Sequence, residues 1–166
     1  VYYAGKAFLS TAVAQWMAAE GLNIDTASGG ELAVALAAGV DPARIGLHGN
    51  NKSDRELDQA VRAGIGAIVI DAVEEIDRVA AVAARYGRVQ PVRLRTNSGV
   101  HAHTHEYLAT AREDQKFGVP LADIEAAVAR IREHSATLTF LGLHSHIGSQ
   151  ILVADGFLEA ARRLLE

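Results

Sequence analysis

Short apolar segments alternate with helical segments along the chain, and this alternation constrains the fold more than any other feature. Most of the apolar segments lack alternating polar residues, so we expect strands that are buried on both faces, as in a parallel sheet. The order of strand and helix predicts right-handed crossovers and a parallel α/β fold. The predicted strands are Tyr2–Ala4, Leu22–Ile24, Ile45–Leu47, Ala67–Ile70, Val92–Leu94 and Leu138–Leu143.

Capping signals and glycines bound the helices between these strands. Ser53 with Glu56 predicts a capping box that opens a helix ending near Gly64. Pro120 suits the entrance of the helix that follows it. The other predicted helices are Leu9–Glu20, Gly30–Ala38, Val73–Tyr86, Leu121–Glu133 and a last helix that begins at Asp155.

A polar or charged residue lies at or just beyond the carboxyl end of each predicted strand: Lys6, Asp25, His48, Asp71, Arg95 and His146. Enzymes with a (β/α)8 barrel build their active sites at this end of the strands. The near-constant spacing of the strands favours a partial TIM barrel with about six of the eight βα units. The rival fold is an open doubly wound sheet, which usually carries a glycine-rich phosphate loop after its first strand. Ala4-Gly5-Lys6-Ala7 is no such loop.

Both ends of the sequence look interrupted. Val1 already begins a predicted strand, and the chain stops at Glu166 within a predicted helix, whereas natural termini more often fray through polar residues. We therefore expect residues 1–166 to form one domain that is truncated at both ends.

Composition restricts the possible partners and sites. A net charge of -4 argues against nucleic acid or an anionic membrane as the main partner. The absence of cysteine excludes disulfides and thiolate metal sites. No apolar run approaches the roughly 20 residues of a membrane span, so a cytoplasmic protein is expected.

Lys6 is the first candidate catalytic residue. A lysine at the end of a buried strand is unusual, because burying an ammonium without a partner is unfavourable. Partial desolvation lowers the pKa of a lysine, which suits Schiff-base chemistry. The alternative is a lysine whose ammonium simply reaches solvent, and this is the commoner case.

Two loops could approach a ligand. Asp25 precedes a loop in which Gly29 and Gly30 lead into a helix N-terminus, a place where backbone can contact a ligand closely. An ordinary capped turn explains this loop more simply. His48-Gly49-Asn50-Asn51-Lys52-Ser53 is a second polar loop, and it too could be a plain turn into a capped helix.

The histidines suggest a metal site as an alternative. His101, His103 and His105 alternate, as do His144 and His146, so the members of each set would share a face on extended backbone. Metal-dependent barrel hydrolases use such pairs, but typically on the first strand, and no carboxylate ligand is clearly placed here. No metal is therefore expected. The second set has a non-metal interpretation, in which an imidazole stacks on an aromatic ring while Gly148-Ser149 donates to a phosphate.

Five motifs, in this order, resemble the diaminopimelate decarboxylase family, which belongs to the barrel-type decarboxylases that use pyridoxal 5'-phosphate. They are Tyr3-Ala4-Gly5-Lys6-Ala7, Ser28-Gly29-Gly30-Glu31-Leu32, His48-Gly49-Asn50-Asn51-Lys52-Ser53, His103-Thr104-His105-Glu106 with Asp114-Gln115-Lys116-Phe117-Gly118, and His144-Ser145-His146-Ile147-Gly148-Ser149-Gln150. The fourth is similar to the actinobacterial branch. The resemblance covers essentially the whole chain.

The resemblance implies an alanine racemase-like barrel and a role for each site residue. Lys6 would hold the aldehyde of the cofactor covalently, and His146 would stack on the pyridine ring. Ser149, beside Gly148, would bind the phosphate. Asp25 and Arg95 would line the pocket, with Glu31 at its edge.

The family's reaction is decarboxylation of meso-2,6-diaminopimelate to L-lysine and CO2, the last step of lysine biosynthesis. The resemblance also implies a homodimer with shared active sites, and a C-terminal β-domain that lies outside these residues. Three alternatives remain. They are a related ornithine, arginine or carboxynorspermidine decarboxylase, a non-enzymatic cofactor-binding barrel, and a histidine-ligated metal hydrolase. Absorbance of the bound cofactor, lost on borohydride reduction, separates the first two from the third.

Overall fold

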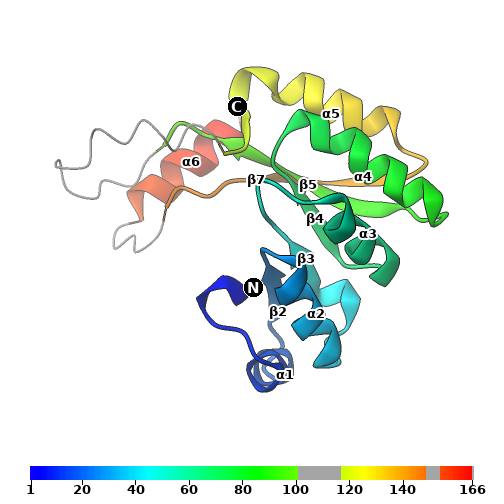
Figure 1. The fold of residues 1–166 in the computed structure, drawn as a ribbon. Helices are drawn as coiled ribbons and strands as arrows, with labels where there is room; N and C mark the ends of the chain where they lie inside the picture. The colour runs from blue at the N-terminus through cyan, green and yellow to red at the C-terminus, as the bar shows by residue number, and fades with distance from the viewer. Residues whose placement is uncertain (101–116, 149–153, 166) are drawn as a thin grey trace.

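The computed structural model describes residues 1–100, 117–148 and 154–165. Six parallel strands follow the order of the chain across one curved sheet (Figure 1). They are β1 (Tyr2–Ala4), β2 (Asn23–Thr26), β3 (Ile45–Leu47), β4 (Ala67–Ile70), β5 (Gln90–Asn97) and β7 (Leu138–His144). All six predicted strands are therefore confirmed.

A seventh strand, β6 (Val119–Pro120), was not predicted from the sequence. It pairs in parallel with the carboxyl end of β5, where Thr96 lies opposite Val119. The strand β7 pairs with β5 along its length, and no pairing joins β7 to β1 among the residues that the structure describes. The sheet is thus a partial barrel that stays open between its first and last strands.

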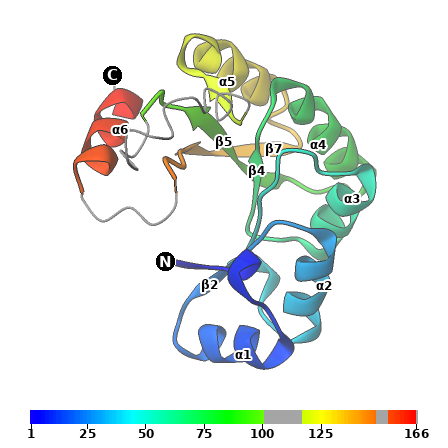
Figure 2. The same cartoon turned by 60° about the vertical axis from the view of Figure 1, so that its left-hand side comes forward.

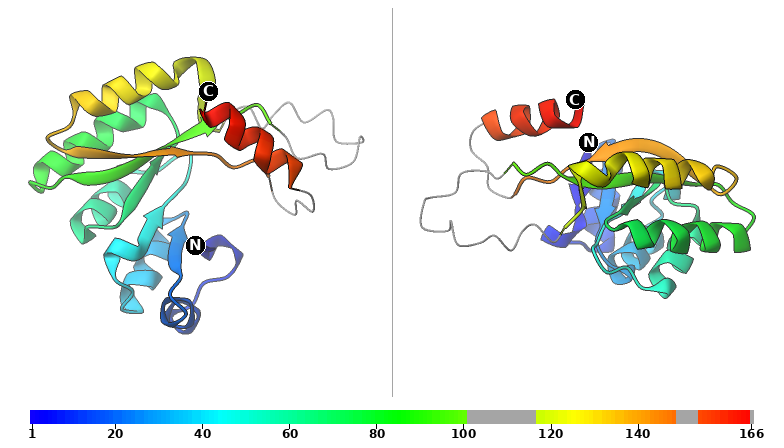
Figure 3. Two further views of the ribbon diagram at one scale, coloured as in Figure 1. Left: turned by 180° about the vertical axis from the view of Figure 1, so that it is seen from behind. Right: turned by 90° about the horizontal axis from the view of Figure 1, so that it is seen from above.

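The helices cover the outer, convex side of the sheet. Figure 2 shows α1 to α5 following one another around this side, while α6 lies apart from them, beyond the carboxyl end of β7. Helices α4 and α5 lie side by side over the same part of the sheet (Figure 3). The bounds are α1 (Thr11–Ala19), α2 (Gly29–Ala37), α3 (Asp54–Ala63), α4 (Val73–Arg85), α5 (Ile124–Glu133) and α6 (Asp155–Leu165), with 3₁₀ turns η1 (Gly5–Ala7), η2 (Pro42–Arg44) and η5 (Leu121–Asp123).

The capping box at the start of α3 is confirmed. Ser53 Oγ accepts a hydrogen bond from the backbone N–H of Glu56, and Glu56 Oε2 accepts from the backbone N–H of Ser53 at 2.9 Å. Glu56 Oε1 also accepts from the N–H of Gly29 at 2.8 Å, so the same carboxylate joins the start of α3 to the start of α2. Hydrogen bonds from the Ser53 and Gly29 backbone lower the pKa of Glu56, because they stabilise its charged form. Gly64, with φ of 73°, ends α3 in the left-handed conformation that favours glycine.

Burial explains why the strands could be recognised. All four residues of β4 are at most 1% exposed, as expected for a central strand with both faces covered. In contrast, β5 alternates: Val92 and Leu94 are buried, while Arg93 and Arg95 are half-buried. Successive side chains of a strand point to opposite faces, so the arginines lie on the inner face, away from the covering helices. No helix among the described residues is long and apolar enough to cross a membrane.

Candidate active site

A pocket of about 390 Å³ lies at the carboxyl ends of β1, β5 and β7. Four of the six predicted site residues line it, namely Lys6, Arg95, His146 and Gly148. The remaining lining residues are Thr96, Asn97, Ser98, Val100, Phe117 and Ile147. The fold thus brings together residues from the two ends of the chain, at the edge where barrel enzymes place their chemistry.

Lys6 lies in the 3₁₀ turn η1, directly after β1. Its side chain is exposed, which agrees with the alternative of a lysine that reaches solvent and not with partial desolvation. The reason is that β1 has a neighbour on one side only, β2, among the described residues. Lys6 therefore offers its amine to the pocket from an open rim.

Asp25, in β2, is not among the residues that line this pocket. Its Oδ1 pairs with His48 Nδ1, just beyond the end of β3. His48 Nε2 in turn lies 3.1 Å from His144 Nε2, at the end of β7. The two imidazole centroids are 4.6 Å apart, so a chain of three polar side chains crosses the inner face of the sheet.

His144 is neutral over the physiological pH range. Burial, the charges of His48 and Arg95, and further cationic neighbours together lower the pKa of His144 to about 3. His144 Nδ1 is buried, and it has no hydrogen-bond partner among the described residues.

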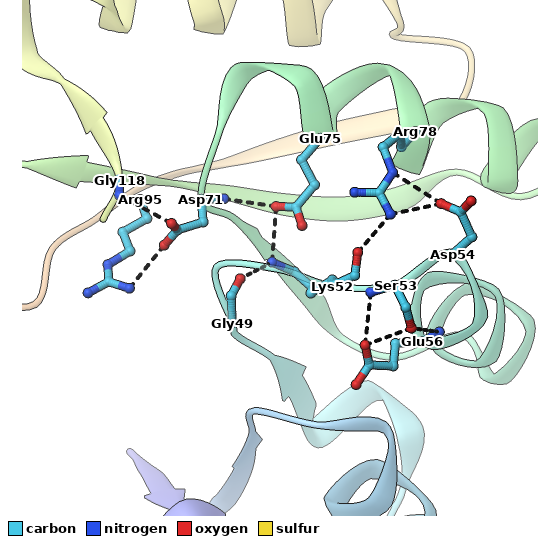
Figure 4. Close-up of polar contacts among 10 residues, drawn as sticks. All are labelled: Gly49, Lys52, Ser53, Asp54, Glu56, Asp71, Glu75, Arg78, Arg95 and Gly118. Atoms are coloured by element: carbon cyan, nitrogen blue, oxygen red, sulfur yellow. Dashed lines mark hydrogen bonds and ion pairs between the residues drawn. The ribbon is translucent and has the colours of Figure 1, made fainter. Parts of the chain in front are cut away.

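Arg95 enters the pocket from β5, held by Asp71, which follows β4 (Figure 4). Arg95 Nη1 donates to Asp71 Oδ1 at 2.9 Å, and the guanidinium carbon lies 5.0 Å from the centroid of the Phe117 ring. Asp71 is only 6% exposed, so this ion pair is shielded from solvent on the Asp71 side. The pair gives the pocket a cation with a fixed partner.

Lys52 is the residue that sequence reasoning missed. The polar loop after β3 could be a plain turn into a capped helix, yet Lys52 is only 3% exposed. Its Nζ donates to Glu75 Oε2 at 3.0 Å and to the carbonyl of Gly49. Burial lowers the pKa of Lys52, and the Glu75 carboxylate opposes that shift. A signal existed, because Glu75 lies on the apolar stripe of α4 with Ile76 and Val79, a position where a buried charge requires a partner.

Of the other candidate residues, one lies outside the pocket and four fall outside the described residues. Glu31 does not line the pocket; its Oε2 accepts from the N–H of Ala27 at 2.7 Å and so supports the turn after β2. Ser149, His101, His103 and His105 lie outside the described residues. Within the part of the chain that the structure describes, no group of three or more histidine or acidic side chains could hold a metal ion.

The family model for the pyridoxal binding domain of pyridoxal-dependent decarboxylases matches residues 1–166. This chain belongs to that family. Diaminopimelate decarboxylase from Mycobacterium leprae is 56% identical over 99% of this chain. The same enzyme from Corynebacterium efficiens is 48% identical over the whole chain.

Solved structures agree with this membership. Diaminopimelate decarboxylase from Helicobacter pylori, complexed with L-lysine, superposes with a TM-score of 0.88 at 30% identity over 98% of this chain. The protein from M. jannaschii in complex with L-lysine superposes with a TM-score of 0.87 at 29% identity over 99% of this chain. This chain spans 35% and 36% of the M. leprae and C. efficiens proteins, and 41% and 38% of the H. pylori and M. jannaschii chains. It therefore corresponds to part of each relative.

Proposed function

We propose that the protein containing this chain is a carboxy-lyase that converts meso-2,6-diaminopimelate to L-lysine and CO2 with pyridoxal 5'-phosphate as cofactor. One observation carries the proposal. Lys6, Arg95 and His146 line a single pocket in a chain that is 56% identical to a diaminopimelate decarboxylase.

The residues of the pocket fit this cofactor. A volume of about 390 Å³ suits a small aromatic phosphate, and Lys6 supplies a primary amine that can bond to an aldehyde. His146 offers a flat imidazole to stack on the pyridine ring, and Arg95 offers a cation for an anionic oxygen. Gly148 has no side chain to cover its backbone N–H and can adopt its φ of 136°, which suits a phosphate contact together with Ser149.

The side chains of this chain then have distinct tasks. The cofactor, when bound, withdraws electrons from the bond that breaks as CO2 leaves. Lys6 would hold the cofactor through its amine, and the same amine, when free, could hold or return a proton. Arg95 and His146 would orient the bound molecules. Asp25 would contribute through the imidazole of His48 with which it pairs.

Several relatives of the same fold act on other amino acids. A lysine decarboxylase from Selenomonas ruminantium and a lysine/ornithine decarboxylase from Vibrio vulnificus superpose at 24% and 21% identity, which shows the fold alone. The much higher identity to the M. leprae protein favours meso-diaminopimelate as the substrate over ornithine or arginine.

The same comparison supports three further parts of the proposal. We infer a C-terminal β-domain outside residues 1–166, because this chain accounts for little more than a third of its relatives. The resemblance to the family carries the proposal of a homodimer with shared active sites. We also infer a cytoplasmic location, where a lysine-forming enzyme meets its soluble substrate.

Borohydride labelling tests the cofactor site. The full-length protein, loaded with the cofactor and reduced, should carry the stable adduct on Lys6 when its peptides are analysed by mass spectrometry. Lys6→Ala should abolish the absorbance of the bound cofactor, while the buried Lys52 stays unlabelled and serves as the internal control. An adduct on another lysine would contradict the assignment.

Substrate choice is tested by CO2 release. Meso-diaminopimelate should be turned over at least ten times faster than ornithine, arginine or lysine at equal concentration. A ten-fold ratio of rates corresponds to a difference of about 1.4 kcal/mol in activation free energy. Faster release from ornithine or arginine would favour the related decarboxylases instead. Cofactor binding with no release from any of the four would favour a non-enzymatic binding protein.

A further inference from the structure

Four charged side chains, three of them buried, form a connected network that reaches the pocket through Arg95 (Figure 4). Lys52, Asp71 and Glu75 are between 3% and 6% exposed, and the Arg95 side chain is 17% exposed. The network contains two cations and two anions, so it is balanced without any ligand. Buried charges are tolerated only when they are paired and hydrogen-bonded, and here each has a partner.

Asp71 is the centre of this network. Its Oδ1 accepts from Arg95 Nη1 at 2.9 Å, and its Oδ2 accepts from the backbone N–H of Gly118 at 3.3 Å. The carboxylate thus bridges β5 and the segment that leads into β6. Gly118 can come this close because it has no side chain: a Cβ there would lie 3.0 Å from the carbonyl oxygen of Arg95.

The backbone of Asp71 is held as well as its side chain. Its N–H donates to Glu75 Oε2 at 2.9 Å, and the same oxygen accepts from Lys52 Nζ at 3.0 Å. One carboxylate oxygen on α4 therefore ties the end of β4 to the loop after β3. The ammonium of Lys52 holds the Glu75 carboxylate in place for its hydrogen bond from the Asp71 backbone.

The Arg95 guanidinium is therefore held by two contacts. Asp71 binds the edge of the guanidinium, and the Phe117 ring lies 5.0 Å from its carbon. An arginine side chain without such contacts samples many rotamers and loses that freedom on binding a ligand. Asp71 itself is not among the residues that line the pocket, so it acts on a ligand only through Arg95.

We propose that Asp71 is a positioning residue that fixes the Arg95 guanidinium in the pocket, and that the Lys52–Glu75 ion pair fixes Asp71. The ligand of Arg95 is an anionic group of the cofactor or of the substrate, so this inference rests on the proposed function. The network needs little rearrangement when the ligand arrives, because its charges are already paired and aligned.

A double-mutant cycle in the full-length protein tests the inference. Asp71→Asn, Arg95→Gln and the double variant are titrated with pyridoxal 5'-phosphate, and the KM for meso-diaminopimelate is measured beside the cofactor Kd. Asp71→Asn should raise either the Kd for the cofactor or the KM for meso-diaminopimelate by on the order of ten-fold, a size typical of directly coupled neighbours. In the Arg95→Gln background the same substitution should change it less than about two-fold.

The matched control is Asp77→Asn. Asp77 lies on α4, the helix that carries Glu75, and it also binds an arginine, Arg130, but that pair is exposed and neither residue lines the pocket. Asp77→Asn should leave both constants unchanged in either background. Equal effects of Asp71→Asn with and without Arg95 would overturn the inference, because they would indicate a merely structural role.

Two further outcomes are decisive. If Arg95→Gln alters neither constant, Arg95 has no ligand and the inference fails, while labelling of Lys6 still decides the cofactor site separately. If Asp71→Asn does not fold, Lys52→Met with Glu75→Leu removes the ion pair that holds Asp71 without leaving a buried charge unpaired, and neither residue lines the pocket. That variant should also lose most of its effect in the Arg95→Gln background, and additive effects would again overturn the inference.

Discussion

Replacing Lys52 by methionine should destabilise the region around β4 and β5 far more than a lysine substitution usually does. Methionine keeps much of the aliphatic stem but removes the ammonium that donates to Glu75 Oε2 and to the Gly49 carbonyl. The side chains of Lys52 and Glu75 are 2% and 6% exposed, so Glu75 would remain as an unpaired carboxylate without access to water.

The structure sets the size of the effect. Breaking a buried ion pair by removing one partner typically costs about 3–5 kcal/mol. Glu75 keeps the hydrogen bond from the Asp71 backbone, which moves the expected loss toward the lower end, about 3 kcal/mol. Replacing both partners, as in Lys52→Met with Glu75→Leu, should cost less than Lys52→Met alone, because no charge is then left buried.

Hydrogen exchange of the β4 and β5 amides in the full-length protein measures this loss locally. A global melting temperature is less suitable, since a multidomain protein need not unfold in two states. Arg130→Met is the matched control, because it breaks the exposed pair with Asp77 on α4 and should leave exchange unchanged. Equal exchange in the Lys52 and Arg130 variants, or a double variant less stable than Lys52→Met, would refute the reasoning.

Two further predictions concern pH and the isolated chain. His144 has a pKa of about 3 in the folded protein, below the unfolded value near 6.5. Its contribution to the free energy of unfolding is therefore fully present above about pH 6.5 and is lost as the pH drops toward 3. The loss should be about 1 kcal/mol per pH unit below about pH 6, and His144→Gln should flatten it in pH-dependent denaturation; an unchanged slope would contradict the buried neutral imidazole. Residues 1–166 expressed alone should be inactive and self-associate, because β1 and β7 present open edges and Trp16, Phe157 and Leu158 are 54–66% exposed. Light scattering and CO2 release check this, and a monodisperse, active monomer would contradict it.

The strands could be predicted from the sequence because burial on both faces leaves an uninterrupted apolar run. Where that condition fails, prediction fell short. The strand β5 extends to Gln90–Asn97, well beyond the predicted Val92–Leu94, because the polar side chains of Gln90, Arg95 and Asn97 hide its ends from a search for apolar runs. The two-residue strand β6 carries no periodic signal of its own and exists through pairing with β5.

The helix boundaries show a similar limit. The helix expected at Leu121–Glu133 begins with a 3₁₀ turn, and its α-helical part starts only at Ile124. Pro120 gave the correct entrance, but no side chain caps the first turn, so the tighter turn satisfies part of its backbone.

The site was predictable to the extent that strand ends determine it. Lys6, Arg95 and His146 were identified from their place after a strand, and the fold brings them to one pocket. The sequence did not identify Lys52 as the buried lysine, and it left the exposure of Lys6 open, because both depend on what packs beside each side chain. In the sequence, a lysine in a polar loop suggests exposure and a lysine after an apolar strand suggests burial, which is the reverse of what Lys52 and Lys6 show.

Polar residues at the ends of neighbouring strands form acid–base pairs. Asp25 pairs with His48, which lies 23 residues later, and Asp71 pairs with Arg95, which lies 24 residues later. Each interval is one βα unit, and the strands concerned, β2 with β3 and β4 with β5, are direct neighbours in the sheet. An acid at the end of one strand therefore meets a base at the end of the next.

Because Asp25 and Asp71 each bind a base on the next strand, neither carboxylate forms an ion pair with Lys6. Lys6 belongs to neither pair, so its amine stays available to an aldehyde, while Arg95 is oriented and still lines the pocket. A strand-end aspartate in such a barrel should accordingly be interpreted first as a partner for the base on the next strand. Direct contact with the ligand is then the claim that needs its own measurement, and this applies to Asp25 as much as to Asp71.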